Sequence, residues 1–367
     1  MIPPETHVVK DDFFAYYERL FRQYIYRDQY LQDDEVITNK VYIPYSVHIS
    51  DWIEGRVRPF DTRLDHAAAF SPSIVETSDL KKLKFPKLYM DEEKSKENYD
   101  IAQALFGEYL DVIQGEPFYN ASFTEVTGHG TSLVDLWCEL RGLETVFFDL
   151  VDEPEFTKDA MQFLMEGTIE YLHQGIELGV WTLNNNGFVR DSTTPCGTCA
   201  LAYTHELPQK DFDSKVRLKD LWGYSMSQEF HPISPNMLEE FVLPYQAKIA
   251  DLFGLNAYGC CEKNDHKWDI ITEYIPRLRA LSVSPYSSLS LAVNKLEDRY
   301  VLAWKPNPSD MIIAFDPDRI KREMSNAMEI AKDAHLVIIC REIDTVMNEP
   351  ERLTKWIDIT MELAQKY

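Results

Sequence analysis

The chain has 367 residues, enough for one large domain or two ordinary ones, and its 45% hydrophobic content is ample for a closed core. Acidic side chains (61) outnumber basic ones (37), and the formal charge of −24 disfavours nucleic acid and anionic membrane surfaces as partners. The N-terminus has no basic segment followed by an apolar stretch, and no membrane-length apolar run occurs, so we expect a cytoplasmic protein that binds a small molecule.

Residues 8–110 show no regular alternation of strands and helices, and their aromatic-rich, polar pattern predicts mostly helical structure. We expect residues 1–110 to form an N-terminal extension that packs on a barrel made by residues 111–367. The whole chain, 1–367, is then one domain. Whether it is a monomer or a homodimer stays open.

A different pattern begins near residue 116, where short apolar or β-branched runs alternate with long amphipathic segments. This alternation predicts parallel strands joined by crossover helices. Seven strands are expected, at 117–123, 180–183, 221–227, 255–260, 280–283, 300–304 and 335–340, with an eighth that is short or irregular. No glycine-rich turn follows the first strand, which argues against an open doubly wound sheet. The predicted fold is an α/β (β/α)8 TIM barrel.

Helix boundaries are marked by local signals. Ser234 before a proline is expected to cap a helix that is kinked at Pro244 and closed by Gly254. Asp316 before a proline should open a second helix, and Asn348 should open the last one.

In a barrel, chemistry takes place at the carboxyl ends of the strands, so polar residues that follow each strand are candidates. Glu229 and His231 follow the third strand and are the predicted general acid–base pair, with Gln228 beside them as a substrate ligand. Asn185, after the second strand, and Lys305, after the sixth, are predicted to bind substrate. A turn for Asn185, a solvated loop for Glu229 and His231, and a surface position for Lys305 are the structural alternatives.

Six cysteines are few for this length and favour free thiols or metal ligands over a disulfide framework. Cys196 and Cys199 form a lone CxxC on a loop that we expect to cover the barrel mouth. Cys196 is a candidate substrate contact there. A surface loop with incidental cysteines is the alternative.

Several short segments occur in an order that resembles the uroporphyrinogen decarboxylase superfamily across residues 110–367. They are Leu140-Arg141-Gly142 with Asp149, Asp152-Glu153-Pro154, Thr204-His205-Glu206-Leu207-Pro208, Ile233-Ser234-Pro235-Asn236-Met237 and Ser282-Val283-Ser284-Pro285. The resemblance implies a (β/α)8 barrel and either cofactor-free porphyrinogen decarboxylation or zinc-dependent methyl transfer. The early segment Tyr42–His48 contains no arginine, unlike the substrate-gripping signature of the decarboxylases, and therefore favours the methyltransferase branch.

That branch places His-x-Cys after one strand and a further Cys after a later one, and these residues hold zinc. Cys260 and Cys340 stand at the cysteine positions, whereas Tyr258 replaces the histidine. A phenol is a poor zinc ligand near neutral pH because its pKa is about 10. Candidates for the third ligand are Glu262, Cys261 and His266. Adjacent strand residues point to opposite faces, so Cys261 can join Cys260 only if the chain bends there. Buried structural cysteines are the alternative.

The function that the resemblance implies is methyl transfer between a small methylated substrate and a corrinoid cofactor on a partner protein, assisted by zinc. Zinc would hold a substrate sulfur or oxygen as a coordinated anion. A metal-free decarboxylase of a small carboxylic acid or a tetrapyrrole is the alternative function. Substrate identity and the direction of transfer stay open.

Overall fold

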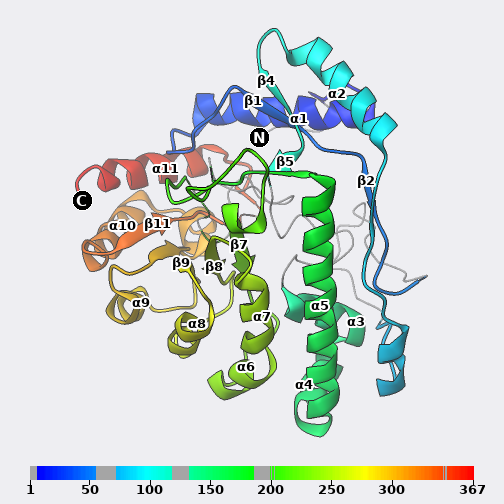
Figure 1. The fold of residues 1–367 in the computed structure, drawn as a ribbon. Coiled ribbons are helices and arrows are strands. Elements are labelled where there is room, and N and C mark those ends of the chain that lie inside the picture. Colours follow the sequence, from blue (N-terminus) through cyan, green and yellow to red (C-terminus); the bar gives the residue numbers. More distant parts are fainter. Residues whose placement is uncertain are drawn as a thin grey trace.

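The centre of the molecule is a five-stranded parallel sheet with the order β11-β10-β9-β8-β7 (Figure 1). The computed structural model describes residues 6–54, 72–117, 132–185, 199, 201, 203–341, 343 and 345–367. The strands are β7 (Trp222–Ser225), β8 (Leu255–Tyr258), β9 (Leu278–Val283), β10 (Val301–Trp304) and β11 (His335–Ile338). Each neighbouring pair is parallel, so the carboxyl ends of these strands lie at one edge.

Helices alternate with these strands and lie around the sheet in Figure 1. They are α6 (Pro235–Phe241), α7 (Leu243–Ala250), α8 (Trp268–Tyr274), α9 (Leu289–Leu296), α10 (Pro317–Ile330) and α11 (Glu351–Ala364), with the short turns η4 (Leu218–Asp220) and η5 (Ser309–Ile313). Their inward-facing residues form hydrophobic clusters with the sheet. This strand–helix alternation confirms the mixed α/β class.

A second parallel pair, β5 (Glu116–Pro117) and β6 (Trp181–Thr182), lies beside β7. Asn184, just after β6, joins the two sheets through its side chain. Its amide donates to the carbonyl of Trp222 (3.0 Å) and its amide oxygen accepts from the N–H of Trp222 (2.9 Å). Among the described residues, this buried side chain joins the end of β6 to β7 in place of the backbone hydrogen bonds that pair neighbouring strands.

Six of the expected strands correspond to β6–β11, and the first, 117–123, overlaps β5 only at Pro117. Residues 118–123 of the first expected strand lie outside the described residues, and closure into an eight-stranded barrel stays a prediction.

The N-terminal part combines helices with short strands. Its elements are α1 (Asp12–Tyr30), β1 (Lys40–Ile43), β2 (Val47–Ile49), η2 (Thr77–Lys82), β3 (Leu88–Met90), α2 (Glu92–Phe106) and β4 (Asp111–Gln114). β1 pairs in parallel with β4, and β2 pairs antiparallel with β3. The mostly helical prediction therefore missed strands, because each has only three or four residues and its partner is distant in the sequence.

Contacts tie this extension to the rest of the chain. Gln174 of α5 (Pro154–Leu178) accepts from the N–H of Leu88 and donates to the carbonyl of Pro86. Leu31, after α1, packs against the cluster of α10 and α11. These contacts join the N-terminal part to α5 and to the cluster of α10 and α11, and the single-domain organisation stays a prediction.

The helices α3 (Leu133–Arg141) and α4 (Leu143–Asp152) are joined by a buried ion pair. Arg141 donates to both carboxylate oxygens of Asp149, at 2.7 and 3.0 Å, and also to the carbonyls of Ile74 and Val75. Two residues of the resembling motifs thus have a structural role here.

The predicted helix boundaries are confirmed in part. Ser234 caps α6 through Met237 N–H (3.2 Å), and Asp316 caps α10. The single helix expected from Ser234 to Gly254 is two helices broken at Val242, because Pro244 has no N–H to continue the ladder. The cap of α11 is Pro350 and not Asn348. No helix in the described ranges is long and apolar enough to cross a membrane.

Candidate functional site

Polar side chains gather where β7, β8, β9 and β10 end, around Cys260. Lys305, the residue after β10, is 1% exposed and donates to the carbonyl of Cys260 (2.8 Å) and to the hydroxyl of Ser282. Ser282 in turn donates to the same carbonyl. Three parallel strands therefore fix the main chain at Cys260, and Lys305 is a buried part of the site and not a surface lysine.

Gly259 bends the chain just before Cys260. It has φ of +97°, a conformation that side-chain-bearing residues rarely adopt, and an added Cβ would lie 3.1 Å from Ser282 Cβ and 3.2 Å from Asn264 Nδ2. Because of this bend, Cys260 and Cys261 do not alternate as strand residues do. Their sulfur atoms lie 3.5 Å apart. The chain therefore has the bend that Cys261 needs in order to act together with Cys260.

Glu262 is 2% exposed and serves the main chain of the site. Its Oε2 accepts from the N–H of Cys260 (2.7 Å), and its Oε1 accepts from the N–H of Ser227 (3.2 Å). The carboxylate thus joins the segment after β7 to the segment after β8. Each of its oxygens is already held by an N–H group.

The thiol of Cys260 is 7% exposed, yet its pKa is lowered to about 6. A hydrogen bond from Cys261 is the largest cause, and the positive charges of Lys305 and Arg341 add to it, whereas burial and Glu262 act in the opposite direction. The lowered pKa favours the thiolate of Cys260, the form that acts as a nucleophile.

Glu229 shows the opposite shift. Burial raises the pKa of its carboxyl to about 7, and the negative charges of Glu262 and Cys260 raise it further. Its Oε2 is buried and has no hydrogen-bond partner among the described residues. A protonated carboxyl and a thiolate therefore coexist around neutral pH, an arrangement typical of a proton donor beside a nucleophile.

The other predicted residues after β7, His231 and Gln228, contact the segments around Cys260. His231 is exposed, no hydrogen bond joins it to Glu229 within the described ranges, and its carbonyl accepts from Lys267 (2.9 Å). Gln228 accepts from the N–H of Cys261 at 3.4 Å. Lys267 is 3% exposed, and burial lowers its pKa to about 8.

Tyr258, which stands where the resemblance would place a histidine, contacts Gln246 of α7. Its hydroxyl lies 3.1 Å from both Ser227 Oγ and Gln246 Oε1, and burial raises its pKa. Gln246 also donates to the carbonyl of Met226 (2.7 Å). This residue therefore belongs to a buried structural network.

Of the predicted zinc ligands, Cys260 and Cys261 lie in contact and Glu262 binds the N–H of Cys260, whereas Cys340 packs in another cluster. No group of three or more His, Cys, Asp or Glu side chains able to hold a metal ion occurs in the described part of the chain. Cys340 packs against the cluster of α10 and α11, whereas its neighbour Ile339 packs in the same cluster as Cys260. Alternation after β11 places Arg341, not Cys340, toward Cys260. His266 is exposed. Zinc binding by these residues stays a prediction.

Cys199 of the CxxC motif does not lie on the surface, as the alternative interpretation of this motif expected. Cys199 is fully buried in the cluster that contains Cys260, donates to the carbonyl of Tyr258 (3.2 Å), and has a pKa that burial raises to about 12. Asn185 donates to the carbonyls of Thr204 (3.4 Å) and Leu207, so it joins the end of β6 to residues 204–207. Cys196 lies outside the described residues.

Three contributors were not predicted as site residues: Gly259, Ser282 and Asn264. Asn264 is 1% exposed, and neither atom of its amide has a hydrogen-bond partner among the described residues. Gly259 carried a usable signal, since a glycine directly after a buried strand often marks a bend. Ser282 lies within β9, where no local pattern separates it from a packing residue.

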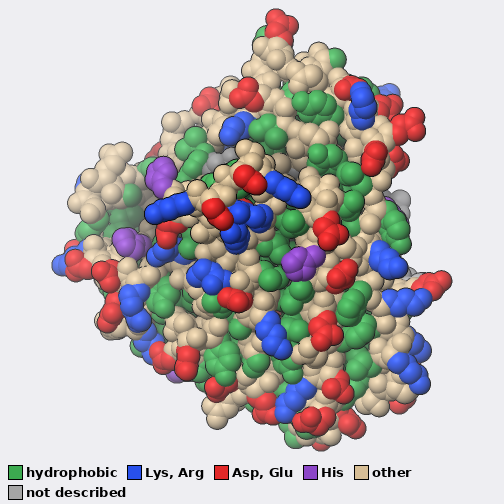
Figure 2. All heavy atoms as spheres, in the orientation of Figure 1, with side chains coloured by type: hydrophobic (Ala, Val, Ile, Leu, Met, Phe, Trp, Pro, Cys, Tyr) green, Lys and Arg blue, Asp and Glu red, His purple; other side chains and the backbone are tan. Residues whose placement is uncertain are grey.

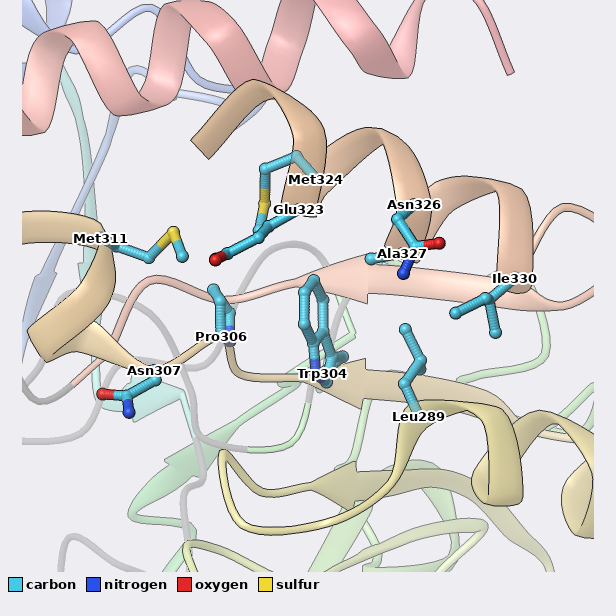
Figure 3. Close-up of a pocket in the computed structure, with 10 residues that line it drawn as sticks. All are labelled: Leu289, Trp304, Pro306, Asn307, Met311, Glu323, Met324, Asn326, Ala327 and Ile330. Carbon is cyan, nitrogen blue, oxygen red and sulfur yellow. The ribbon is translucent and has the colours of Figure 1, made fainter. Parts of the chain in front are cut away.

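A pocket of about 230 Å³ lies elsewhere, between β10 and α10 (Figure 3). Its lining includes Trp304, Met311, Met324 and Leu289. Trp304 and Lys305 are successive residues, and strand alternation sends them to opposite faces of the sheet. The pocket is therefore separate from the site at Cys260.

The surface in Figure 2 shows acidic and basic side chains interspersed with hydrophobic ones. Ion pairs also occur between exposed side chains, since Asp211 pairs with Arg217 (3.0 Å) and Lys219 (2.8 Å).

No protein-family model matches the chain, and no curated protein matches it. Among solved structures, it is similar to a methyltransferase from Methanosarcina mazei, with a TM-score of 0.43 and 13% sequence identity over 82% of this chain and 80% of that chain. These comparisons assign the chain to no family.

Proposed function

We propose that the chain is a methyltransferase that moves a methyl group between a small methylated compound and a corrinoid on a partner protein. The observation that supports this most is the meeting of Cys260, Glu229 and Lys305 at the ends of parallel strands. The order of motifs that resembles the uroporphyrinogen decarboxylase superfamily also supports it, together with the lack of arginine in Tyr42–His48.

The proposed chemistry follows from the thiolate form of Cys260 and the protonated form of Glu229. A thiolate is a soft nucleophile suited to attack on a methyl carbon, whereas a nitrogen or oxygen leaving group departs more easily when it receives a proton. We propose that Cys260 Sγ forms the new bond to the methyl carbon while the carbon–heteroatom bond breaks. The proton of Glu229 then goes to the departing atom. A bound corrinoid would supply the cobalt that exchanges the methyl group with Cys260.

The surrounding contacts would keep Cys260 in place during the reaction. Its carbonyl accepts from Lys305 and Ser282, and its N–H donates to Glu262. Because the main chain of Cys260 is held by these hydrogen bonds, its sulfur needs little movement to reach the reacting geometry. Holding the reacting groups in alignment lowers the barrier to methyl transfer.

The alternative, a metal-free decarboxylase, would use hydrogen bonds at the barrel mouth, and a cation free to pair with the substrate carboxylate would strengthen binding. The two buried lysines near the site each already donate two hydrogen bonds inside the protein, Lys305 to Cys260 and Ser282 and Lys267 to the carbonyls of Phe230 and His231. Methyl transfer to a thiolate needs no such free cation and is therefore preferred.

The test is a panel of N-methyl and O-methyl compounds incubated with the protein and with cobalamin reduced to Co(I), followed by the absorption change on cobalt methylation. We expect activity with at least one donor, loss in Cys260→Ser and a marked decrease in Glu229→Gln. Cys138→Ser is the matched control, because Cys138 is a buried thiol on α3 with a pKa raised to about 12. Carbon dioxide release from carboxylic acids, with no methylation of cobalt, would establish the alternative instead.

A further inference from the structure

We propose that Cys260 and Cys261 form a redox-active dithiol that hydroperoxides convert reversibly into a disulfide between the two neighbouring residues. The proposal rests on the geometry of the pair and holds whether or not the chain transfers methyl groups.

The two sulfurs are already in contact. Cys260 Sγ and Cys261 Sγ lie 3.5 Å apart, although successive residues in an extended strand would point their side chains to opposite faces. The bend at Gly259, with φ of +97°, removes that alternation. Only a short movement of either side chain separates this contact from a sulfur–sulfur bond.

Cys260 and Cys261 differ in exposure, as the proposed oxidation requires. Cys260 is 7% exposed, whereas Cys261 is half-buried and reaches the surface of the site. Lys305 lies against Cys260, donating to its carbonyl at 2.8 Å, and Arg341 adds a second positive charge nearby. Cationic surroundings favour the anionic sulfur that attacks a peroxide.

The reaction balances with a hydroperoxide as the oxidant. The thiolate of Cys260 attacks the distal peroxide oxygen, the O–O bond breaks, and the departing alkoxide or hydroxide takes a proton, which leaves a sulfenic acid on Cys260. The thiol of Cys261 then attacks that sulfur. The S–OH bond breaks, the S–S bond forms, and one water molecule leaves.

Such a disulfide is expected to be easy to reduce. Neighbouring Cα atoms across a trans peptide are about 3.8 Å apart. Relaxed disulfides join Cα atoms about 4.4–6.8 Å apart, so this ring is strained, and strained disulfides are the labile ones. The site would therefore be blocked under oxidising conditions and restored by ordinary thiols.

Two other buried cysteines serve as internal references. Burial raises the pKa of both Cys138 and Cys199 to about 12, so they remain thiols and react slowly with peroxide. Cys199 lies in the same hydrophobic cluster as Cys260 and is the rival partner for a disulfide.

The experiment treats the full chain with hydrogen peroxide, blocks remaining thiols and cleaves after lysine and arginine. Residues 249–263 then form one peptide that contains both Cys260 and Cys261. We expect this peptide to become lighter by two hydrogen atoms, and dithiothreitol to restore its mass. In Cys261→Ser, which keeps a hydrogen-bond donor beside Cys260, oxidation should stop at a sulfenic acid that dimedone traps.

Cys138→Ser is the control and should form the disulfide like the unaltered chain, and circular dichroism would verify that each variant is folded. Direct conversion of Cys260 to higher acids in the unaltered chain would overturn the proposal. So would a disulfide that joins peptide 249–263 to the peptide containing Cys199.

Discussion

Replacing Cys261 by alanine should return Cys260 to the protonated form at neutral pH. The pKa of Cys260 is about 6 against an ordinary value of 9.0, and the hydrogen bond from Cys261 is the largest cause. At pH 7 a thiol with the ordinary pKa is only about one-hundredth thiolate, and the lowered pKa of Cys260 increases that fraction. Cys261→Ala removes the donor and leaves burial opposed only by Lys305 and Arg341, so the pKa should rise steeply.

The assay is a pH titration of the thiolate's ultraviolet absorption, taken as the difference between each protein and its Cys260→Ser counterpart. We expect a midpoint near pH 6 in the unaltered chain, a much higher one in Cys261→Ala, and an intermediate one in Cys261→Ser, whose hydroxyl can still donate. An unaltered-chain midpoint at or above that of an ordinary thiol would refute the reasoning. So would a midpoint that Cys261→Ala leaves unchanged.

The lowered pKa also has a consequence for stability. Because the folded chain holds Cys260 as thiolate at a pH where the unfolded chain still binds the proton, the unfolded state binds more protons between about pH 6 and 9. This group therefore stabilises the fold increasingly as the pH rises through that window. The contribution is lost as the pH falls through about 6.

Three further predictions concern buried residues that stabilise the fold. Asp149→Asn should lower the free energy of unfolding by about 3–5 kcal/mol in urea titrations, since it leaves the buried guanidinium of Arg141 without its counter-charge; a loss below about 1 kcal/mol would contradict this. Gly259→Ala should cost about 1–3 kcal/mol because the added Cβ meets Ser282 at φ of +97°, and an unchanged unfolding midpoint would show that the turn relaxes freely. Asn184→Ala should speed amide hydrogen exchange at Trp222, whose N–H it binds at 2.9 Å; unchanged exchange would exclude the proposed link between β6 and β7.

The positions of the central strands were accessible from sequence because their signals are local. A parallel strand buried on both sides is a short apolar run between turns, and this pattern marked β6 to β11 correctly. Helix caps are equally local, as Ser234 and Asp316 show. The strands of the N-terminal part were missed because β1 and β4 gain their stability from each other across about seventy residues of chain.

Part of the site could also be predicted. Parallel strands end at one edge of a sheet, so Glu229, Cys260 and Lys305 could be expected near one another before any coordinates were known. Their chemical states could not be predicted. A pKa depends on burial and on charges that come from other strands, and the same rule raises it for Glu229 and lowers it for Cys260.

The face toward which a side chain points after a strand was decided only by the tertiary structure. One left-handed glycine puts Cys260 and Cys261 on the same side, whereas unbroken alternation after β11 turns Cys340 toward the helices. Sequence spacing also suggested a surface position for Cys199, which the fold buries completely. Local patterns determine which segments are strands, but side-chain direction depends on single backbone angles and on the packing of segments distant in sequence, which no local pattern records.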